Sequence, residues 1–210
     1  MSQFFSIHPD NPQQRLVRQA VDIINAGGVI AYPTDSAYAL GCHMGDKKAM
    51  ARIRRIRRLD DSHNFTLVCR DLSEISTYAK FGNVVYRLLK AHTPGAYTFI
   101  LPATSEVPKR LMQAKRKTIG IRVPDNAVTQ CLLDELGEPL MSTTLIMPGE
   151  ELPLADPWEM RQTLEHEVDL VIDGGFCGFE ATSVIAFEDD VPVLVRQGKG
   201  SVEDFVWLFR

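Results

Sequence analysis

The stretch YPTDSAYALGC, residues 32–42, decides how the fold of this chain is interpreted. It follows GGVIAY, residues 27–32, which has the length and composition of a short buried strand. Pro33 removes a backbone donor and favours an extended conformation in the residue before it, so the strand ends there. A threonine, an aspartate and a serine at 34–36 then lie just beyond the strand, where open α/β sheets bind ligands. The same residue types cap ordinary turns, so the stretch predicts either a ligand site or a capped turn.

The composition is that of a soluble globular protein. Of 210 residues, 45% are hydrophobic and 24% charged, which allows a substantial core. No apolar stretch approaches the ~20 residues that cross a bilayer, and the first 15 residues lack signal-peptide features, so we expect a cytoplasmic protein without a membrane partner. The four cysteines form no C-x-x-C pair and the five histidines no H-x-x-x-H pair. We therefore predict reduced thiols, histidines used for packing or on the surface, and no metal site.

Predicted helices and strands alternate along the chain. Hydrophobic spacing and caps predict helices over 12–26, 46–58, 84–92, 127–136, 157–166 and 201–209, the first of them with Asn11 as N-cap. Apolar or alternating runs predict strands over 2–7, 29–32, 65–69, 97–101, 118–123, 139–143, 168–173, 182–187 and 192–196. Residues 148–157 are predicted to form a surface loop. The alternation predicts one α/β domain over 1–210, with a core at about 14–200 and a mostly parallel or mixed sheet.

The helix predicted over 46–58 is unusually basic. It carries seven basic residues against one acidic residue, a net charge of +6, whereas the whole chain has −4 and the remainder therefore −10. Like charges at helical spacing destabilise a helix by a few tenths of a kcal/mol per pair. The run predicts either an anionic partner such as phosphate or a merely solvated face. A second basic cluster at 109–122 favours a local groove for anions.

Familiar nucleotide and acyl-transfer motifs are missing from the sequence. It contains no G-x-x-x-x-G-K-[ST], no G-x-G-x-x-G and no G-x-S-x-G. A nucleotide would therefore be bound by another kind of loop.

Five segments together resemble the signature blocks of the YrdC-like family, whose members include the threonylcarbamoyl-AMP synthases. In family order they are YPTDSAYALGC (32–42), HTPG (92–95), TIGIRVPDN (118–126), GFEATSVI (178–185) and VLVRQG (193–198). The resemblance extends from about residue 15 to residue 200.

The resemblance implies a fold and an activity. The fold would be a single-domain, twisted, open mixed α/β sheet with a large positively charged cavity. Family members bind ATP, threonine and bicarbonate and form a carbamate on the threonine nitrogen. The carbamate attacks the α-phosphorus of ATP, giving threonylcarbamoyl-AMP and pyrophosphate, and the product serves modification of adenosine 37 in tRNA. Magnesium would accompany ATP in such a reaction. Binding of double-stranded RNA is also ascribed to the family.

The same resemblance assigns site residues by motif, without naming a catalytic residue. The substrate would contact Thr34, Ser36, Arg122, Ser142 and Thr182. The nucleotide would contact Arg57, Thr118, Thr144 and Arg196. The basic clusters would give RNA-binding residues at Arg54, Arg55, Arg58, Lys115, Arg116 and Lys117. The alternatives are turn capping for the first two, solvated charge for Arg57, and strand-edge packing for Ser142, Thr144 and Thr182.

The chain departs from the synthase pattern at three points. Synthases carry Lys-x-Arg-Pro where residues 57–60 are Arg-Arg-Leu-Asp, and Ser-Ala-Asn where 144–146 are Thr-Leu-Ile. Ala181 replaces an expected serine. Losing one phosphate cation costs about 3 kcal/mol in the transition state, around a hundredfold in rate. We therefore expect either an enzyme weaker than the main synthases, or a non-catalytic double-stranded RNA or tRNA binding protein that retains the cavity. No oligomeric state is predicted.

Overall fold

The computed structural model describes residues 1–60, 63–113 and 115–206, and its main feature is one sheet. Its ten strands are β1 Gln3–Ser6, β2 Ile30–Tyr32, β3 Ala39–His43, β4 Thr66–Val68, β5 Tyr97–Pro102, β6 Thr118–Arg122, β7 Leu140–Thr144, β8 Leu170–Asp173, β9 Ser183–Glu188 and β10 Val191–Arg196. The helices are α1 Gln14–Asn25, α2 Lys47–Arg57, α3 Leu72–Tyr78, α4 Asn83–His92, α5 Ala127–Leu136, α6 Pro157–Leu164 and α7 Glu203–Val206, with a 3-10 turn, η1, at Lys109–Leu111.

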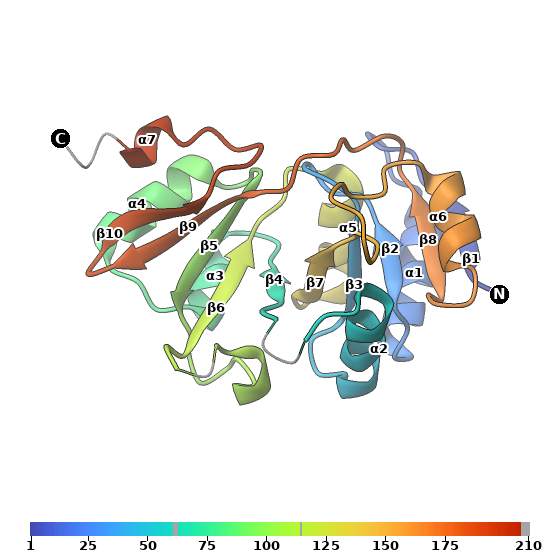
Figure 1. The fold of residues 1–210 in the computed structure, drawn as a ribbon, viewed down its shortest axis with the longest axis horizontal. Coiled ribbons are helices and arrows are strands. Elements are labelled where there is room, and N and C mark those ends of the chain that lie inside the picture. Colours follow the sequence, from blue (N-terminus) through green and yellow to red (C-terminus); the bar gives the residue numbers. More distant parts are fainter. Residues whose placement is uncertain (61–62, 114, 207–210) are drawn as a thin grey trace.

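The sheet is mixed and runs along the long axis of the molecule (Figure 1). The strand order is β1-β8-β2-β3-β7-β4-β6-β5-β9-β10. Four of its pairings are parallel and five are antiparallel. This confirms the predicted α/β class and the twisted mixed sheet, whereas the single domain over 1–210 stays a prediction.

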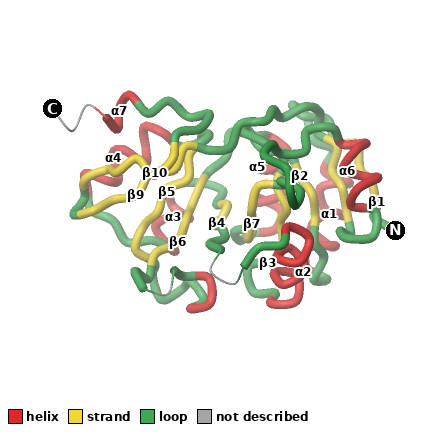
Figure 2. The backbone as a smooth tube through the Cα atoms, viewed as in Figure 1, coloured by secondary structure: helices red, strands yellow, loops and turns green. Residues whose placement is uncertain are grey.

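Helices cover both faces of the half that contains β1, β8, β2, β3 and β7 (Figure 2). Side chains alternate across a strand, and Ile30 and Tyr32 accordingly join one apolar cluster with α1 and α5. Ala31 points the other way, into the cluster that contains the buried residues of α2 and α6. Burial on both faces explains why these strands appear in the sequence as continuous apolar runs.

The other half buries mainly one face of its sheet. Ile119 and Ile121 of β6 belong to the cluster that receives the apolar residues of α3 and α4. Thr118, Gly120 and Arg122 alternate with them and line a cavity on the opposite face. The alternation TIGIR therefore places polar side chains where a ligand can reach them.

The end of α2 fixes the geometry of the basic segment. Asp46 caps the helix by accepting hydrogen bonds from the backbone N–H groups of Lys48 (2.8 Å) and Ala49 (2.9 Å). The helix ends at Arg57, since Arg58 adopts a left-handed conformation with φ of 50°. The helix predicted over 46–58 therefore ends one residue earlier, and Leu59 lies beyond it.

Other sequence expectations need correction. Residues 39–43, for which no strand was predicted, form β3, which pairs with β2 on one side and β7 on the other and is buried at its first four residues. The sequence prediction also missed α3, which Asp71 caps at the N–H of Glu74. Asn11 does not cap α1; the helix begins after Gln13, and the ring of His8 accepts the N–H of Asn11. The last predicted helix is α7, and residues 207–209 lie outside the described residues.

Among the described residues, no helix is both long and apolar enough to span a bilayer.

Candidate functional site

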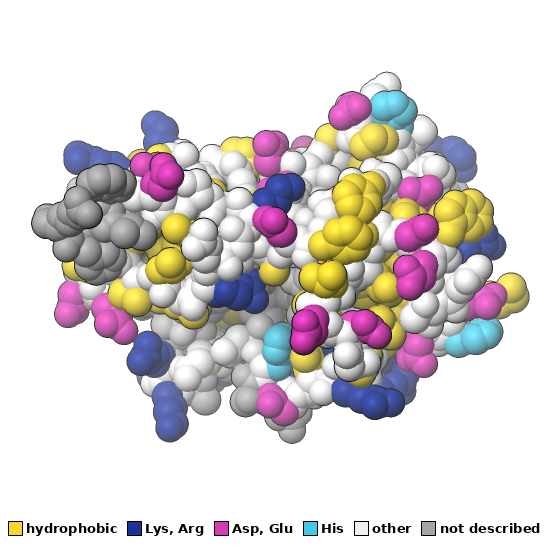
Figure 3. All heavy atoms as spheres, turned by 45° about the horizontal axis from the view of Figure 1, so that its top comes forward, with side chains coloured by type: hydrophobic (Ala, Val, Ile, Leu, Met, Phe, Trp, Pro, Cys, Tyr) yellow, Lys and Arg dark blue, Asp and Glu magenta, His cyan; other side chains and the backbone are white. Residues whose placement is uncertain are grey.

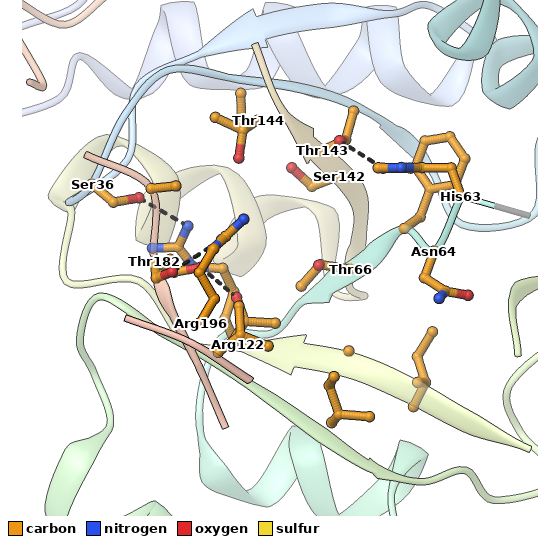
Figure 4. Close-up of a pocket in the computed structure, with 18 of the residues that line it drawn as sticks. Ser36, His63, Asn64, Thr66, Arg122, Ser142, Thr143, Thr144, Thr182 and Arg196 are labelled. Carbon is orange, nitrogen blue, oxygen red and sulfur yellow. Dashed lines mark hydrogen bonds between the residues drawn. The ribbon is translucent and has the colours of Figure 1, made fainter. Parts of the chain in front are cut away.

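A cavity of about 280 Å³ lies at the middle of the sheet, between the 33–38 loop and strands β5, β6 and β7 (Figure 4). Three arginines and one histidine line it: Arg57, Arg122, Arg196 and His63. The described residues of the lining include no aspartate or glutamate. The volume is near the lower end of the range of small-molecule sites, and the charge is positive, so the cavity suits a small anionic ligand.

The cavity brings together eight of the nine residues that the sequence assigns to substrate or nucleotide. They are Ser36, Arg57, Thr118, Arg122, Ser142, Thr144, Thr182 and Arg196. Their individual roles stay predictions. Thr34 is the exception, because its hydroxyl donates to the Ala37 carbonyl (2.6 Å) and accepts the N–H of Ser36 (3.2 Å). Thr34 therefore caps the turn, and it lines a different cavity beside Asp35.

Arg122 already has an internal partner. One terminal nitrogen donates to the Ser36 hydroxyl (3.2 Å), and the other is paired with the carboxylate of Asp35. Each side chain of this ion pair is only 10% exposed. The N–H of Asp125 donates to the same carboxylate (3.0 Å), and Lys199 donates to the Asp35 carbonyl. A substrate carboxylate at Arg122 would therefore share the guanidinium with Asp35.

Arg196 reaches the cavity from the end of β10. The register of β9 and β10 shifts between Leu194 and Arg196, and such a bulge redirects the side chain that follows. Its guanidinium donates to the Thr182 carbonyl (3.0 Å). Gly198 permits this close packing, since a Cβ there would lie 2.2 Å from the Ala181 oxygen. Figure 4 shows the Arg122 and Arg196 side chains on the same side of the cavity.

Arg57 connects α2 to the end of β7. Its Nε donates to the carbonyl of Ile146 (2.7 Å), and its Nη1 donates to the Thr143 hydroxyl (3.0 Å) and the Thr144 carbonyl (2.5 Å). Burial lowers its pKa, although an arginine remains charged at neutral pH. Arg57 therefore supplies fixed positive charge while also bracing the wall, which neither of our sequence interpretations anticipated.

Hydroxyl groups form much of the remaining polar lining, together with the side-chain amides of Asn64 and Gln113. The Ser142 hydroxyl is bonded to that of Tyr32 (2.7 Å) and donates to the Leu40 carbonyl (3.2 Å). Complete burial raises the pKa of Tyr32 to about 12, so this phenol stays neutral. The Thr182 hydroxyl is bonded to Thr98 (2.8 Å). These groups can orient a ligand without adding charge.

Sequence reasoning missed two residues of this site. Asp35 lies inside the opening motif, and its place between Thr34 and Ser36 could have suggested a partner for a nearby cation. His63 was interpreted as a packing or surface histidine, but it lines the cavity with Nε2 3.3 Å from the Thr143 hydroxyl. No spacing pattern links it to a ligand, so only the fold identifies it.

The three departures from the synthase pattern differ in position. Ile146 and Ala181 line the cavity, so the changes there alter its wall directly. Leu59 is not part of that lining. Arg58 lines a second cavity of about 1090 Å³ together with Met147 and Phe176, so it does not replace the missing cation.

The predicted RNA-binding residues do not all remain available. Arg54 packs over the Phe65 ring (5.0 Å to its centre) and its Nε is buried. The remaining five are exposed: Arg55, Arg58, Lys115, Arg116 and Lys117. Long ion pairs link Arg55 to Glu167 (3.8 Å) and Arg116 to Glu188 (3.7 Å). On the face in Figure 3, basic side chains are scattered among acidic ones rather than gathered into one patch.

The site offers little to a resident metal ion. In residues 1–60, 63–113 and 115–206, no group of three or more His, Cys, Asp or Glu side chains could hold one. Magnesium prefers carboxylates and phosphate oxygens, and the described lining contributes no carboxylate.

Comparison with known proteins gives relatives over nearly the whole chain. The Sua5_yciO_yrdC family model, described as "Telomere recombination", matches residues 22–198. The uncharacterised protein YciO of Escherichia coli (strain K12) is 61% identical over 98% of this chain and 100% of its own length. Its crystal structure superposes with a TM-score of 0.94 over the same shares of the two chains.

More distant relatives include a protein named for its activity and one whose structure contains a ligand. A threonylcarbamoyl-AMP synthase of Nitrosococcus oceani is 33% identical over 75% of this chain and 85% of its own length. P. abyssi Sua5, whose structure is complexed with L-threonine, gives a TM-score of 0.89 at 21% identity, over 99% of this chain and 61% of that chain. The last comparison supports the fold alone.

Proposed function

Because the chain belongs to the Sua5/YciO/YrdC family, we propose that its central cavity binds ATP with threonine and bicarbonate and forms threonylcarbamoyl-AMP, more slowly than the synthases do. The observation that carries the proposal is the cavity lining, in which three guanidinium groups and several hydroxyls converge without an acidic residue among the described ones. The product would serve tRNA modification.

In this proposal, different residues of the cavity contact the phosphates and the amino acid. A carbamate oxygen attacks the α-phosphorus of ATP. The bond between the α-phosphorus and the oxygen that bridges to the β-phosphorus breaks, and pyrophosphate leaves with the negative charge. Arg57 and Arg196, whose described partners are neutral oxygens, offset that charge. Ser36 and the Asp35–Arg122 pair form the end that would receive the amino acid. A partly enclosed cavity also protects the carbamate from water.

The proposal is tested by pyrophosphate release from ATP and magnesium. We expect release that requires both threonine and bicarbonate. Arg196→Gln should lower the rate about a hundredfold, as removal of one electrostatic donor does elsewhere. Arg116→Gln, which removes an exposed arginine outside the cavity, serves as the matched control. Release without threonine, or no release at all, would contradict the proposal.

A second candidate is a non-catalytic RNA-binding protein. It is favoured by the exposed residues Lys115, Arg116 and Lys117. Affinity for tRNA or for a short RNA duplex should then fall steeply with salt, because each phosphate contact releases counterions. Charge reversal at Arg55 and Arg58 should make the RNA affinity depend less steeply on salt concentration. Arg18→Glu on α1 should leave this salt dependence unchanged. A flat salt response would remove this candidate.

A further inference from the structure

Two of the three cavity arginines give part of their five N–H donors to the protein itself. In Arg57, Nε and Nη1 donate to two carbonyls and one hydroxyl of the protein. In Arg122, each of the two terminal nitrogens donates one hydrogen bond, to Ser36 and to Asp35. Both guanidinium groups supply positive charge, but an incoming phosphate also needs hydrogen-bond donors. A further donor in the cavity would therefore strengthen the binding of a phosphate.

His63 lies where it can meet that need. Figure 4 shows it on the opposite side of the cavity from Ser36, with its ring directed toward Thr143. Nε2 is 3.3 Å from the Thr143 hydroxyl, the same oxygen that accepts a hydrogen bond from Arg57. The ring also stands edge-on to Phe65, with centres 5.9 Å apart. Two contacts thus hold the imidazole at the cavity wall.

We propose that His63 is a conditional cation of this cavity: it is neutral when the cavity is empty and takes up a proton when a phosphate-bearing ligand binds. A protonated imidazole has two N–H donors, so it can keep its bond to Thr143 and offer the other N–H to the ligand. The inference rests on the proposed binding of a nucleotide in the cavity.

The charges around His63 support this coupling. Burial and then Arg57 lower the pKa of His63, Arg54 acts in the same direction, and Asp60 acts in the opposite one. A bound phosphate would offset the repulsion from Arg57 and so favour the imidazolium. Since binding then takes up a proton, affinity for the anion must rise as the pH falls. If the pKa of His63 rises by about one unit when the anion binds, the affinity for the anion changes by up to about tenfold over the pH range in which His63 titrates.

The experiment follows the ring signals of His63 by NMR between pH 5 and pH 8. Sulfate is the first probe, because it does not itself titrate in this range, and ATP is the second. The same titrations are run on His63→Gln and on His166→Gln, a control that removes an exposed histidine on the loop after α6. We expect the pKa of His63 to lie below 6.5 without ligand and to rise with saturating sulfate. Sulfate should bind about tenfold more tightly at pH 5 than at pH 8 in the wild type and in His166→Gln, but with little pH dependence in His63→Gln.

Two outcomes would overturn the inference in different ways. Sulfate or ATP could perturb the cavity signals while the titration of His63 stays unchanged and His63→Gln keeps the full pH dependence. The cavity would then bind anions, and only the role of His63 would be wrong. If neither probe perturbs any cavity signal at either pH, the proposed function fails and the inference fails with it.

Discussion

The carboxylate of Asp35 is paired with the guanidinium of Arg122, which lines the cavity, and each side chain is only 10% exposed. The pair joins the loop after β2 to the end of β6, two segments far apart in the sequence. It gives the opening motif a structural role that is independent of any ligand. It also leaves Arg57 and Arg196 as the cavity arginines whose described hydrogen-bond partners are all neutral.

Replacing Asp35 by Asn should destabilise the fold. Arg122 would keep its charge in a buried position without a counterion, and breaking a buried pair in this way costs about 3 kcal/mol. Urea denaturation measures the loss in the free energy of unfolding. Asp22→Asn, an exposed acid on α1, should change stability by less than about 0.5 kcal/mol. Equal midpoints for the two variants would show that the pair does not stabilise the fold.

Arg57→Met should weaken the wall as well as the charge of the cavity. The substitution leaves the carbonyls of Thr144 and Ile146 without their donor, at a cost of about 2 kcal/mol. Arg57→Lys should not restore stability, because an ammonium group lacks the planar fork that meets three acceptors. Thermal and urea unfolding test this, with Arg55→Met as the exposed control on the same helix. Full stability in Arg57→Lys would contradict the bracing role.

Restoring the residue type of the synthases should change the rate of pyrophosphate release more at position 181 than at position 59. Ala181 lines the cavity, so Ala181→Ser adds a hydroxyl that a ligand can contact. One added hydrogen bond is worth about 1 kcal/mol, roughly a fivefold faster release of pyrophosphate. Leu59→Arg should give no comparable gain, because position 59 is not part of the cavity lining. A larger gain from Leu59→Arg than from Ala181→Ser would reverse this assignment.

Gly198→Ala should displace the loop that follows Arg196. A Cβ there would lie 2.2 Å from the Ala181 oxygen and 2.6 Å from the Thr182 carbonyl, and backbone atoms cannot move aside cheaply. We expect a loss of about 2 kcal/mol in stability and weaker anion binding. In Gly82→Ala the new Cβ meets only the Asp190 side chain (3.1 Å), so that variant, which replaces the N-cap of α4, should lose less stability than Gly198→Ala. Wild-type behaviour of Gly198→Ala would remove the proposed constraint.

Much of this architecture could be predicted from the sequence because the local signals were strong. The alternation in TIGIR placed Thr118 and Arg122 on one face of β6, and the fold confirms that they line the cavity. Segment 39–43 was missed as a strand because small residues such as Gly41 carry little periodicity. Gly41 is required there by packing, since a Cβ would lie 2.7 Å from the Tyr32 ring.

The electrostatic pairing within the site was not predictable in the same way. The sequence indicates that Asp35, His63 and Arg122 are titratable or charged, but their mutual distances depend on tertiary packing. Basic residues of segment 46–58 appeared equivalent in the sequence, yet α2 directs Arg57 into the cavity and Arg54 onto Phe65. Arg58, in its left-handed conformation after the helix, lines the second cavity instead.

Calorimetric titration of ATP into the wild type and into Arg196→Gln tests the central claim most directly. We expect the wild type to bind ATP and the variant to bind it at least about tenfold more weakly, since a charge-assisted contact of about 1.5–3 kcal/mol is lost. Arg116→Gln should bind like the wild type. Equal ATP affinity in the wild type and Arg196→Gln would show that the nucleotide does not occupy this cavity.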